Sequence, residues 1–346
     1  MIKESNRNGS FYNLKNTLFK FVAMVKSYLI KTVILLLLFF TACKKDSTVF
    51  IPNSDQQLDS AWVAAPAANA QVFQLAAKLA GAFFAQEVNL VNDTALKTNT
   101  GLIVEFPRSA LVTGGTTITG TIKTQYALIQ KKGDFIRYGI PTVSNKMPLE
   151  SAGALYLKLT NLNGEIITVA PTKNIYIRYP ESDIKQGMSL YYSNLPVSNF
   201  SLFNWLPAND GSIVSIWTSP TPPQKGYVIK TSRTGWLNVD RLLEPTLTRT
   251  EAGVVLPNLF SNANTVVFLV FKNLNTVVQL TGNLDFRKFH HPNIPVEVDA
   301  KFISISKVGD TYYLGTKDER IVPNQITYIR PDISNLDKIN NLLNSL

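Results

Sequence analysis

The sequence predicts an all-β protein in which two β-sandwich-like domains follow a signal peptide and a flexible tether. Three observations support this prediction. From Gly101 onward, apolar and polar residues alternate in short runs. Turn signals separate these runs by about eight to twelve residues, a spacing typical of a β-sandwich. The pair Asn163-Gly164 lies between two such runs and is a strong signal for a hairpin turn.

The N-terminus predicts a signal peptide over residues 1–42. Residues 32–40 are apolar and follow Lys26 and Lys31. About nine apolar residues are too few for a membrane-spanning helix, which needs about 20. They match the apolar region of a signal peptide instead. Met24 begins a signal of conventional proportions by itself, so residues 1–23 are compatible with an upstream extension from a misassigned start.

The run Leu-Phe-Phe-Thr-Ala before Cys43, the only cysteine of the chain, resembles the lipobox of bacterial lipoproteins. The resemblance implies that a lipid is attached to the Cys43 sulfur and anchors the protein in the membrane. Lys44 follows the cysteine, which favours sorting to the outer membrane, with the periplasmic and the surface-exposed face both open. With no second cysteine, structural disulfides and cysteine catalysis are excluded in the mature chain.

Removal of the signal peptide changes the charge of the protein. Residues 1–42 contain six basic side chains and one acidic side chain, so the formal net charge of +10 falls to about +5. Spread over the mature chain, this charge gives no reason to expect binding to nucleic acid.

The next segment, residues 43–70, has low complexity and many small residues, and we expect a lipidated tether there. The first β-sandwich is predicted over residues 71–181. Its start is ambiguous because Gly81 and the aromatic pair after it favour a strand. Helical spacing of the apolar residues favours a helix instead: Val72, Leu75, Ala76 and Leu79.

The second β domain is predicted over residues 182–330, from apolar runs such as 265–271. Residues 331–346 predict an amphipathic helix. Ser334 and Asp337 resemble a capping box at its start. One apolar stripe supports the helix: Ile333, Leu336, Ile339, Leu342 and Leu346.

A search for catalytic and metal-binding patterns yields no catalytic residue, cofactor site or metal site. His290 and His291 are adjacent and would point to opposite faces of a strand, so we interpret them as part of a polar loop before Pro292. Ser304 and Lys307 have the spacing found in penicillin-binding enzymes. They lie in an alternating run, however, where a strand would turn them to opposite faces.

Aromatic residues are concentrated between residues 191 and 236, where they can form core or bind a ligand. Aromatic faces stack on sugars and supply rigid contact area at protein interfaces. Trp205 precedes a Pro-Ala-Asn-Asp loop, so we expect it to be exposed. The candidate ligand contacts are Trp205, Tyr191 and Trp217.

Several segments between residues 70 and 325 resemble a family of uncharacterised bacteroidete lipoproteins, which begin with a β-sandwich similar to the ZU-type domain of ankyrins and netrin receptors. The segments are Gly101–Pro107, Thr119–Ile122, Pro148–Tyr156, Asn174–Pro180 and Gly235–Arg241. The resemblance implies extended structure over Val72 to Phe84, against the periodicity. Val239 replaces a cysteine of the family pattern, and no functional residue is implied.

These observations predict a lipid-anchored protein of the cell envelope that binds an envelope protein or a polysaccharide and is not an enzyme. One alternative is a glycan- or peptidoglycan-acting hydrolase, whose carboxylates the sequence does not reveal. Another is a purely structural component of the envelope, which would have neither a pocket nor an aromatic patch. Two acidic side chains about 5 to 10 Å apart in one cleft would favour the hydrolase. An exposed aromatic surface without such a pair would favour binding.

Overall fold

The computed structural model describes residues 61–346, except 92–93, 196–199, 201, 221–222 and 245. The described residues all belong to the compact unit of residues 58–346. The predicted signal peptide, Cys43 and the tether up to residue 60 lie outside the described residues. In the part of the chain that is described, no helix is long and apolar enough to cross a membrane.

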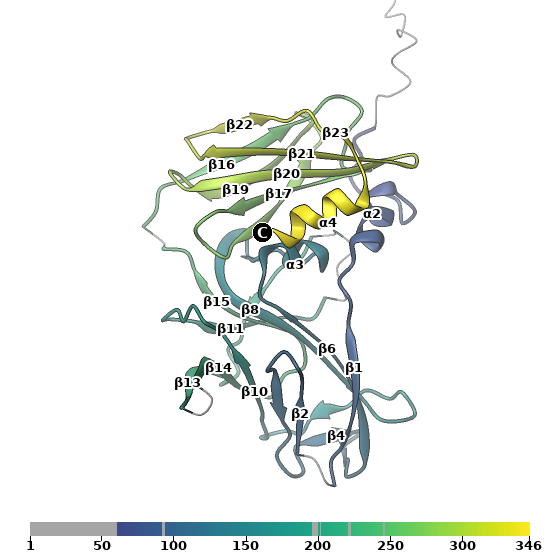
Figure 1. The fold of residues 1–346 in the computed structure, drawn as a ribbon, viewed down its shortest axis with the longest axis vertical. Coiled ribbons are helices and arrows are strands. Elements are labelled where there is room, and N and C mark those ends of the chain that lie inside the picture. Colours follow the sequence, from purple (N-terminus) through teal and green to yellow (C-terminus); the bar gives the residue numbers. More distant parts are fainter. Residues whose placement is uncertain (1–60, 92–93, 196–199, 201, 221–222, 245) are drawn as a thin grey trace, which may run out of the picture. The chain divides into compact units, whose positions relative to one another are not determined.

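The described residues form twenty-three strands and three short helices, which confirms the all-β class (Figure 1). One sheet has seven strands in the order β1-β6-β8-β15-β11-β12, with β7 paired to β8. Its strands are β1 (Phe84–Asn89), β6 (Thr121–Ile129), β7 (Val143–Ser144), β8 (Met147–Thr160), β11 (Ser189–Ser193), β12 (Leu206–Pro207) and β15 (Gly235–Leu242).

A five-stranded sheet lies against it in the order β13-β14-β10-β3-β2. Its strands are β2 (Ala95–Lys97), β3 (Ile103–Glu105), β10 (Ile175–Pro180), β13 (Ile213–Pro220) and β14 (Pro223–Thr231). A three-stranded sheet in the order β5-β4-β9 completes this half. Its strands are β4 (Leu111–Thr113), β5 (Thr116–Thr117) and β9 (Thr168–Val169).

The seven- and five-stranded sheets enclose one hydrophobic core. The five-stranded sheet contributes alternate residues such as Ile177 and Ile229, and the seven-stranded sheet contributes Leu157 and Leu237. Alternation follows from strand geometry, because successive side chains point to opposite faces. This pair of sheets is the β-sandwich that the alternating runs predict.

The remaining strands form an eight-stranded sheet in the order β22-β16-β19-β18-β17-β20-β21-β23. They are β16 (Arg249–Val255), β17 (Thr265–Phe271), β18 (Val277–Asn283), β19 (Lys288–Pro295), β20 (Asp299–Val308), β21 (Thr311–Arg320), β22 (Gln325–Tyr328) and β23 (Asp332–Ser334). All residues of β17 are buried. Val267 belongs to a cluster on one side and Phe268 to a cluster on the other, so both faces are covered and the strand is continuously apolar.

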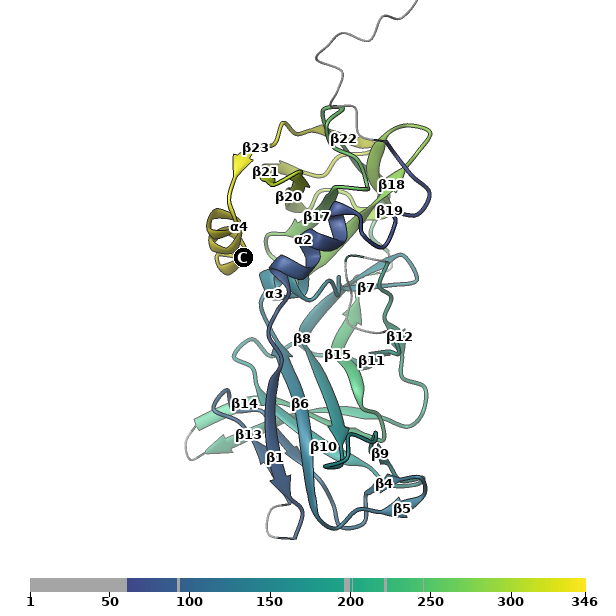
Figure 2. The ribbon, with the colours of Figure 1, turned by 90° about the vertical axis from the view of Figure 1, so that its right-hand side faces the viewer.

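Three helices pack against one of these clusters: α2 (Gln71–Leu79), α3 (Lys132–Arg137) and α4 (Leu336–Asn344). Figure 2 shows α2 beside β17 and β20, while α3 contacts β18 and α4. The same cluster includes Trp236 of the seven-stranded sheet and Phe268 of the eight-stranded sheet. A shared core therefore joins the sandwich to the eight-stranded sheet.

The predicted domain boundary between residues 181 and 182 is wrong. Strand β14 pairs with β10 across it, and β15 pairs with β8. The chain leaves the first two sheets only between Leu242, which ends β15, and Arg249, which begins β16. Spacing along the sequence predicts that strands exist, but it does not reveal partners that lie dozens of residues away.

The last residues of the predicted tether are packed against the fold. The ring of Trp62 lies 5.0 Å from that of Phe289 in the eight-stranded sheet. The backbone of Val63 exchanges two hydrogen bonds with the Asn262 side chain, at 3.1 and 2.6 Å. The tether prediction is therefore wrong for this segment, because an amide and an aromatic ring fix it in place.

The ambiguous segment after residue 70 is a helix, so the periodicity is right and the extended structure implied by the family resemblance is wrong. The four residues at helical spacing are all buried in α2. Gly81 follows the helix, where a Cβ would overlap the ring of Tyr138. The extended segment begins only at Phe84, in β1.

Two predictions, the hairpin turn at Asn163-Gly164 and the start of the C-terminal helix, are only partly right. A turn does form at Asn163-Gly164, with Gly164 at a φ of 87°, but the strand after it soon leaves to pair with β4. The C-terminal helix begins later than predicted. Its N-cap is Asn335, whose side chain accepts a hydrogen bond from the Lys338 backbone N–H at 2.9 Å, whereas Ser334 ends β23.

Candidate functional site

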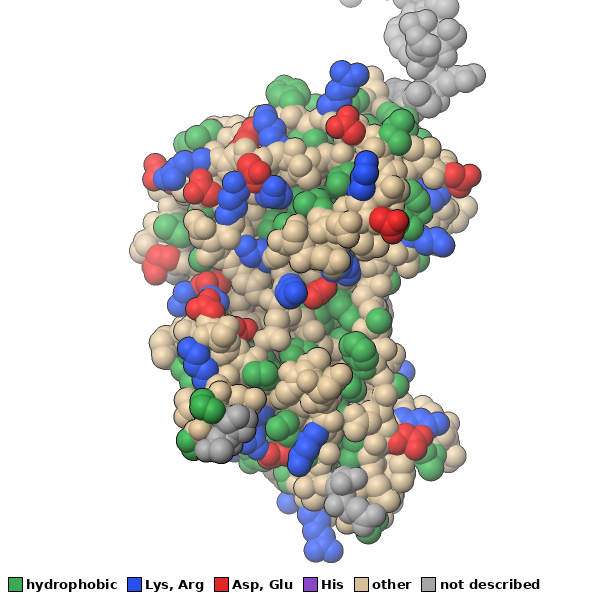
Figure 3. Space-filling model, viewed as in Figure 1, with side chains coloured by type: hydrophobic (Ala, Val, Ile, Leu, Met, Phe, Trp, Pro, Cys, Tyr) green, Lys and Arg blue, Asp and Glu red, His purple; other side chains and the backbone are tan. Residues whose placement is uncertain are grey.

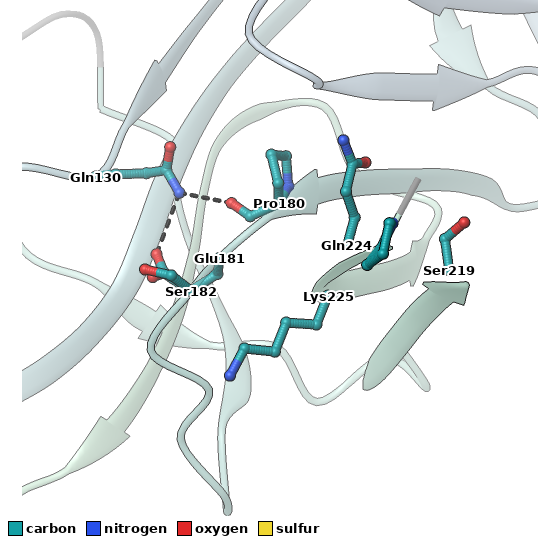
Figure 4. Close-up of a pocket in the computed structure, with 8 residues that line it drawn as sticks. Gln130, Pro180, Glu181, Ser182, Ser219, Gln224 and Lys225 are labelled. Atoms are coloured by element: carbon teal, nitrogen blue, oxygen red, sulfur yellow. Dashed lines mark hydrogen bonds between the residues drawn. The ribbon is translucent and has the colours of Figure 1, made fainter. Parts of the chain in front are cut away.

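A pocket of about 760 Å³ lies where strand β10 ends and strand β14 begins, beside the β13–β14 hairpin (Figure 4). We call it the β10–β14 pocket. Strand β10 is followed by Glu181, whose backbone N–H donates to the Lys225 carbonyl at 2.9 Å and keeps the two chain segments together. The pocket is lined by Gln130, Pro180, Glu181, Ser182, Ser219, Pro223, Gln224 and Lys225.

A glycine shapes the approach to this pocket. Gly226 of β14 lies opposite Pro180 on one side and Trp217 on the other. A Cβ at this position would overlap the carbonyl oxygen of Tyr179. The missing side chain lets the Trp217 indole reach across β14, where its Nε1–H donates to the Tyr179 carbonyl at 3.3 Å. Trp217 is thereby held in one orientation, half-buried, on the face that also carries Ser219.

The pocket is rich in neutral hydrogen-bonding groups. Gln130 donates from Nε2 to the Pro180 carbonyl at 2.8 Å and to Glu181 Oε2 at 3.1 Å, as the dashed lines in Figure 4 show. Glu181 Oε1 also accepts from the Asp183 backbone N–H at 2.9 Å. Side-chain amides, hydroxyls, one carboxylate and one ammonium thus surround a floor that includes two prolines. This set can donate to and accept from a ligand with many hydroxyl groups.

Trp217 belongs to a wider surface, which we call the outer face. It is the face of the five-stranded sheet turned away from the core. Strand register places Ser215, Val228, Arg178 and Ile103 side by side across it. Near its other end, a second pocket of about 560 Å³ includes Tyr176 and the Arg178–Glu105 ion pair. The outer face therefore carries an aromatic side chain toward each end, with polar groups between them.

Of the three candidate aromatics, only Trp217 lies on this surface. Trp205 is 0 % exposed, which contradicts its predicted exposure. Its Nε1–H donates to the Pro141 carbonyl at 3.0 Å, and its backbone N–H bonds to Val143. Tyr191 is also buried, in the same core cluster as Trp205. The loop predicted after Trp205 is only partly confirmed, because Leu206 and Pro207 form strand β12 and irregular structure begins at Ala208. A loop signal also does not determine the direction of the preceding side chain.

The two histidines lie in strand β19 and not in a loop, so that interpretation is wrong. Both line a cavity of about 600 Å³ together with Phe203 and Gln279. Burial lowers the pKa of His291 from 6.5 to about 4, with a smaller contribution from His290. His291 Nδ1 accepts from the Asn293 backbone N–H at 3.3 Å. Among the described residues, no group of three or more His, Cys, Asp or Glu side chains could hold a metal ion.

The Ser304–Lys307 pair does not form a catalytic site. The Ser304 hydroxyl is buried and donates to the Gly315 carbonyl at 3.4 Å. The Lys307 ammonium instead contacts Gln74 Oε1 at 3.2 Å and the Gly309 carbonyl. The two side chains of this strand therefore have separate partners.

Carboxylates are sparse in the pockets of the described chain. The β10–β14 pocket has Glu181 alone, and the second pocket of the outer face has Glu105 alone, paired with Arg178. The cavity beside the histidines has no acidic residue in its lining. A pair of acidic side chains facing one another across these three cavities is not found.

Sequence reasoning missed a buried polar cluster where β15 meets β8. Asn238 donates to Asp240 Oδ2 at 2.6 Å and accepts from the Ser151 hydroxyl at 2.8 Å. Burial raises the pKa of the Asp240 carboxyl well above its ordinary value. The strand register shifts between Asn238 and Asp240. The Asn-Val-Asp run could have indicated such a bulge, but only if the partner strand β8 had been known.

No protein-family model matches this chain, and no curated protein is significantly similar to it in sequence.

Proposed function

We propose that the chain is a lipid-anchored protein of the outer membrane that binds a glycan at the β10–β14 pocket and the adjoining outer face. The observation that carries this proposal is the position of Trp217. The indole is fixed by the Tyr179 carbonyl and shares a face with Ser219, which lines a pocket of amides and hydroxyls. An oriented aromatic ring beside such groups matches the apolar faces and hydroxyl edges of sugars.

The charge balance of the pocket supports binding in preference to hydrolysis. Glu181 accepts hydrogen bonds from Gln130 and from the Asp183 backbone, which leaves it engaged in the structure of the loop. Hydrolysis of a glycosidic bond ordinarily needs a second carboxylate at a defined separation. We therefore favour the non-enzymatic function and a polysaccharide of the envelope as the partner.

The membrane anchor in this proposal rests on the lipobox resemblance around Cys43, and the family membership rests on the segments between residues 70 and 325.

The test is a binding measurement with full-length protein in detergent and envelope polysaccharide immobilised on a surface. We expect Trp217→Ala to weaken binding about tenfold, which corresponds to roughly 1.4 kcal/mol. Tyr328→Ala is the matched control, because Tyr328 is 70 % exposed on the eight-stranded sheet and its loss should leave binding unchanged. Absence of binding by the unaltered protein, or equal loss in both variants, would overturn the proposal.

A further inference from the structure

Strand β13 forms one edge of the five-stranded sheet and pairs only with β14 in the described part of the chain. Figures 1 and 2 both show it at the outside of that sheet. Along an edge strand, alternate residues turn their N–H and C=O groups away from the sheet. Such a row of groups is a template for pairing with another strand.

The other edge strands of the described sheets are protected against this kind of pairing. Each of them is short, carries a charged side chain or contains proline, which are the usual protections of natural sheets. These strands are β1 with Glu87, β2 with Lys97, β12 with Pro207, the two-residue strands β5, β7 and β9, the four-residue β22, and β23 with Asp332.

Strand β13 lacks these protections. It has eight residues, its sequence Ile-Val-Ser-Ile-Trp-Thr-Ser-Pro contains no ionisable side chain, and its proline is the last residue. Ile213 is 51 % exposed and Ile216 is 40 % exposed. At the place of β13 in Figure 1, the surface in Figure 3 shows hydrophobic side chains. A long, apolar, uncharged edge is costly to leave in water, because its apolar surface and its backbone groups both gain from pairing.

We propose that β13 pairs antiparallel with β13 of a second copy of this chain, which joins two five-stranded sheets into one ten-stranded sheet. A two-fold axis perpendicular to the sheet keeps the core side of one copy next to the core side of the other. Because no residue of β13 is ionisable, self-pairing places no charged side chains of the two strands directly opposite each other. This inference stands on the edge strand and does not depend on glycan binding.

The geometry also favours one register. Residues directly opposite each other must lie on the same face of the sheet. The two-fold axis therefore passes between one residue and the same residue of the second copy, and that residue defines the register. An axis through Ile216 places the small Ser215 opposite the partner subunit's Trp217 and leaves Pro220 outside the ladder. An axis through Trp217 would bring two indoles together and place Pro220 within the ladder, where proline cannot donate a hydrogen bond.

The first test is sedimentation of the full-length chain with Cys43→Ser, which removes the predicted lipid and the only thiol. We expect a dimer. Adding Ile216→Lys should raise the dimer dissociation constant at least tenfold, because it places two lysine side chains directly opposite each other, with their Cβ atoms about 5 Å apart at the axis. Ile326→Lys is the matched control, since Ile326 is 38 % exposed on edge strand β22, and it should remain a dimer.

The second test is disulfide trapping, which does not require the lysine variant to fold. In the same cysteine-free background, Ile216→Cys should form an intermolecular disulfide on mild oxidation. Directly opposed residues in an antiparallel pair have Cα atoms about 4.5 to 5.5 Å apart, within the range that a disulfide spans. Ile326→Cys should not crosslink. A monomer in the first test, a dimer that Ile216→Lys leaves intact, or equal crosslinking at both positions would overturn the proposal.

Discussion

At the residue scale, burial of the ionisable His291 side chain makes the stability of the fold depend on pH. The imidazole is buried in β19, and its pKa falls to about 4 because charging it there would remove it from water. In the unfolded chain its pKa is about 6.5. As the pH falls from about 6.5 toward 4, the unfolded state takes up a proton that the folded state does not, and stability is lost.

We expect this single group to reduce the free energy of unfolding by about 2.5 kcal/mol between pH 7.5 and pH 4.5. His291→Gln cannot take up the proton, so its stability should fall by that much less over the same range. Urea unfolding at both pH values measures the difference. His290→Gln is the control, because it removes the neighbouring imidazole and should leave the contribution of His291 in place. A parallel decline in the unaltered protein and in His291→Gln would show that His291 does not carry this pH dependence.

Side-chain direction is the property that the sequence predicts least well at this scale. Trp205, Tyr191 and Trp217 occur in similar surroundings of apolar and small polar residues. Trp205 is buried because its indole N–H finds the Pro141 carbonyl, and Trp217 remains on the surface because Gly226 opens a path to the Tyr179 carbonyl. Both carbonyls come from distant parts of the chain, so no local pattern separates the two residues.

At the element scale, helices α3 and α4 depend on close approach. A Cβ on Gly133 would overlap the carbonyl oxygen of Leu343 near the end of α4. Arg137 of α3 also donates to the Asn340 carbonyl at 3.1 Å and to Asn344 Oδ1 at 2.7 Å. The two helices therefore meet backbone to backbone, and a methyl group between them must push them apart.

We expect Gly133→Ala to destabilise the fold by about 1 to 3 kcal/mol, the usual range for overpacking. Gly120→Ala is the control, since no atom lies within 4 Å of a Cβ there and its φ is ordinary. Thermal unfolding of both variants measures the effect. Equal melting temperatures for the two would mean that α4 can shift without loss.

Element type could be predicted wherever the apolar pattern was strong. The spacing of the buried residues in α2 and the alternation in β10 both match the structure. The family resemblance implied an extended segment in place of α2, and this was wrong. The helical spacing of the apolar residues was the better guide, because it marks the face of α2 that is buried. The histidines of β19 were placed in a loop, since a polar pair before a proline hides the alternation of the strand.

At the scale of the whole molecule, Cys43 determines where the protein resides if the lipobox resemblance holds. We expect the mature protein to partition into the detergent phase of a phase-separating detergent, and Cys43→Ser to partition into the aqueous phase. Mass spectrometry of the N-terminal peptide should show acyl chains on the unaltered protein alone. Recovery of Cys43→Ser in the detergent phase would contradict lipid anchoring through this residue.

Strand pairing is the whole-molecule property that sequence patterns did not supply. Strands β11 to β15 follow the predicted boundary, yet they belong to the first two sheets. The pairing is held by backbone hydrogen bonds, which every strand can make, and its register depends on packing against the shared core. The candidate pocket exists only because of this pairing, since it is built from β10 and β14 together.

The packing of Trp62 also limits how far the protein can work from its membrane. Eighteen peptide links separate Cys43 from Ala61, the first described residue. A chain of that length spans at most about 65 Å. If Cys43 is acylated, Ala61 therefore stays within that distance of the lipid-bearing residue, which is less than the predicted tether of residues 43–70 would allow. A ligand must then come within reach of a fold that is held near the lipid surface.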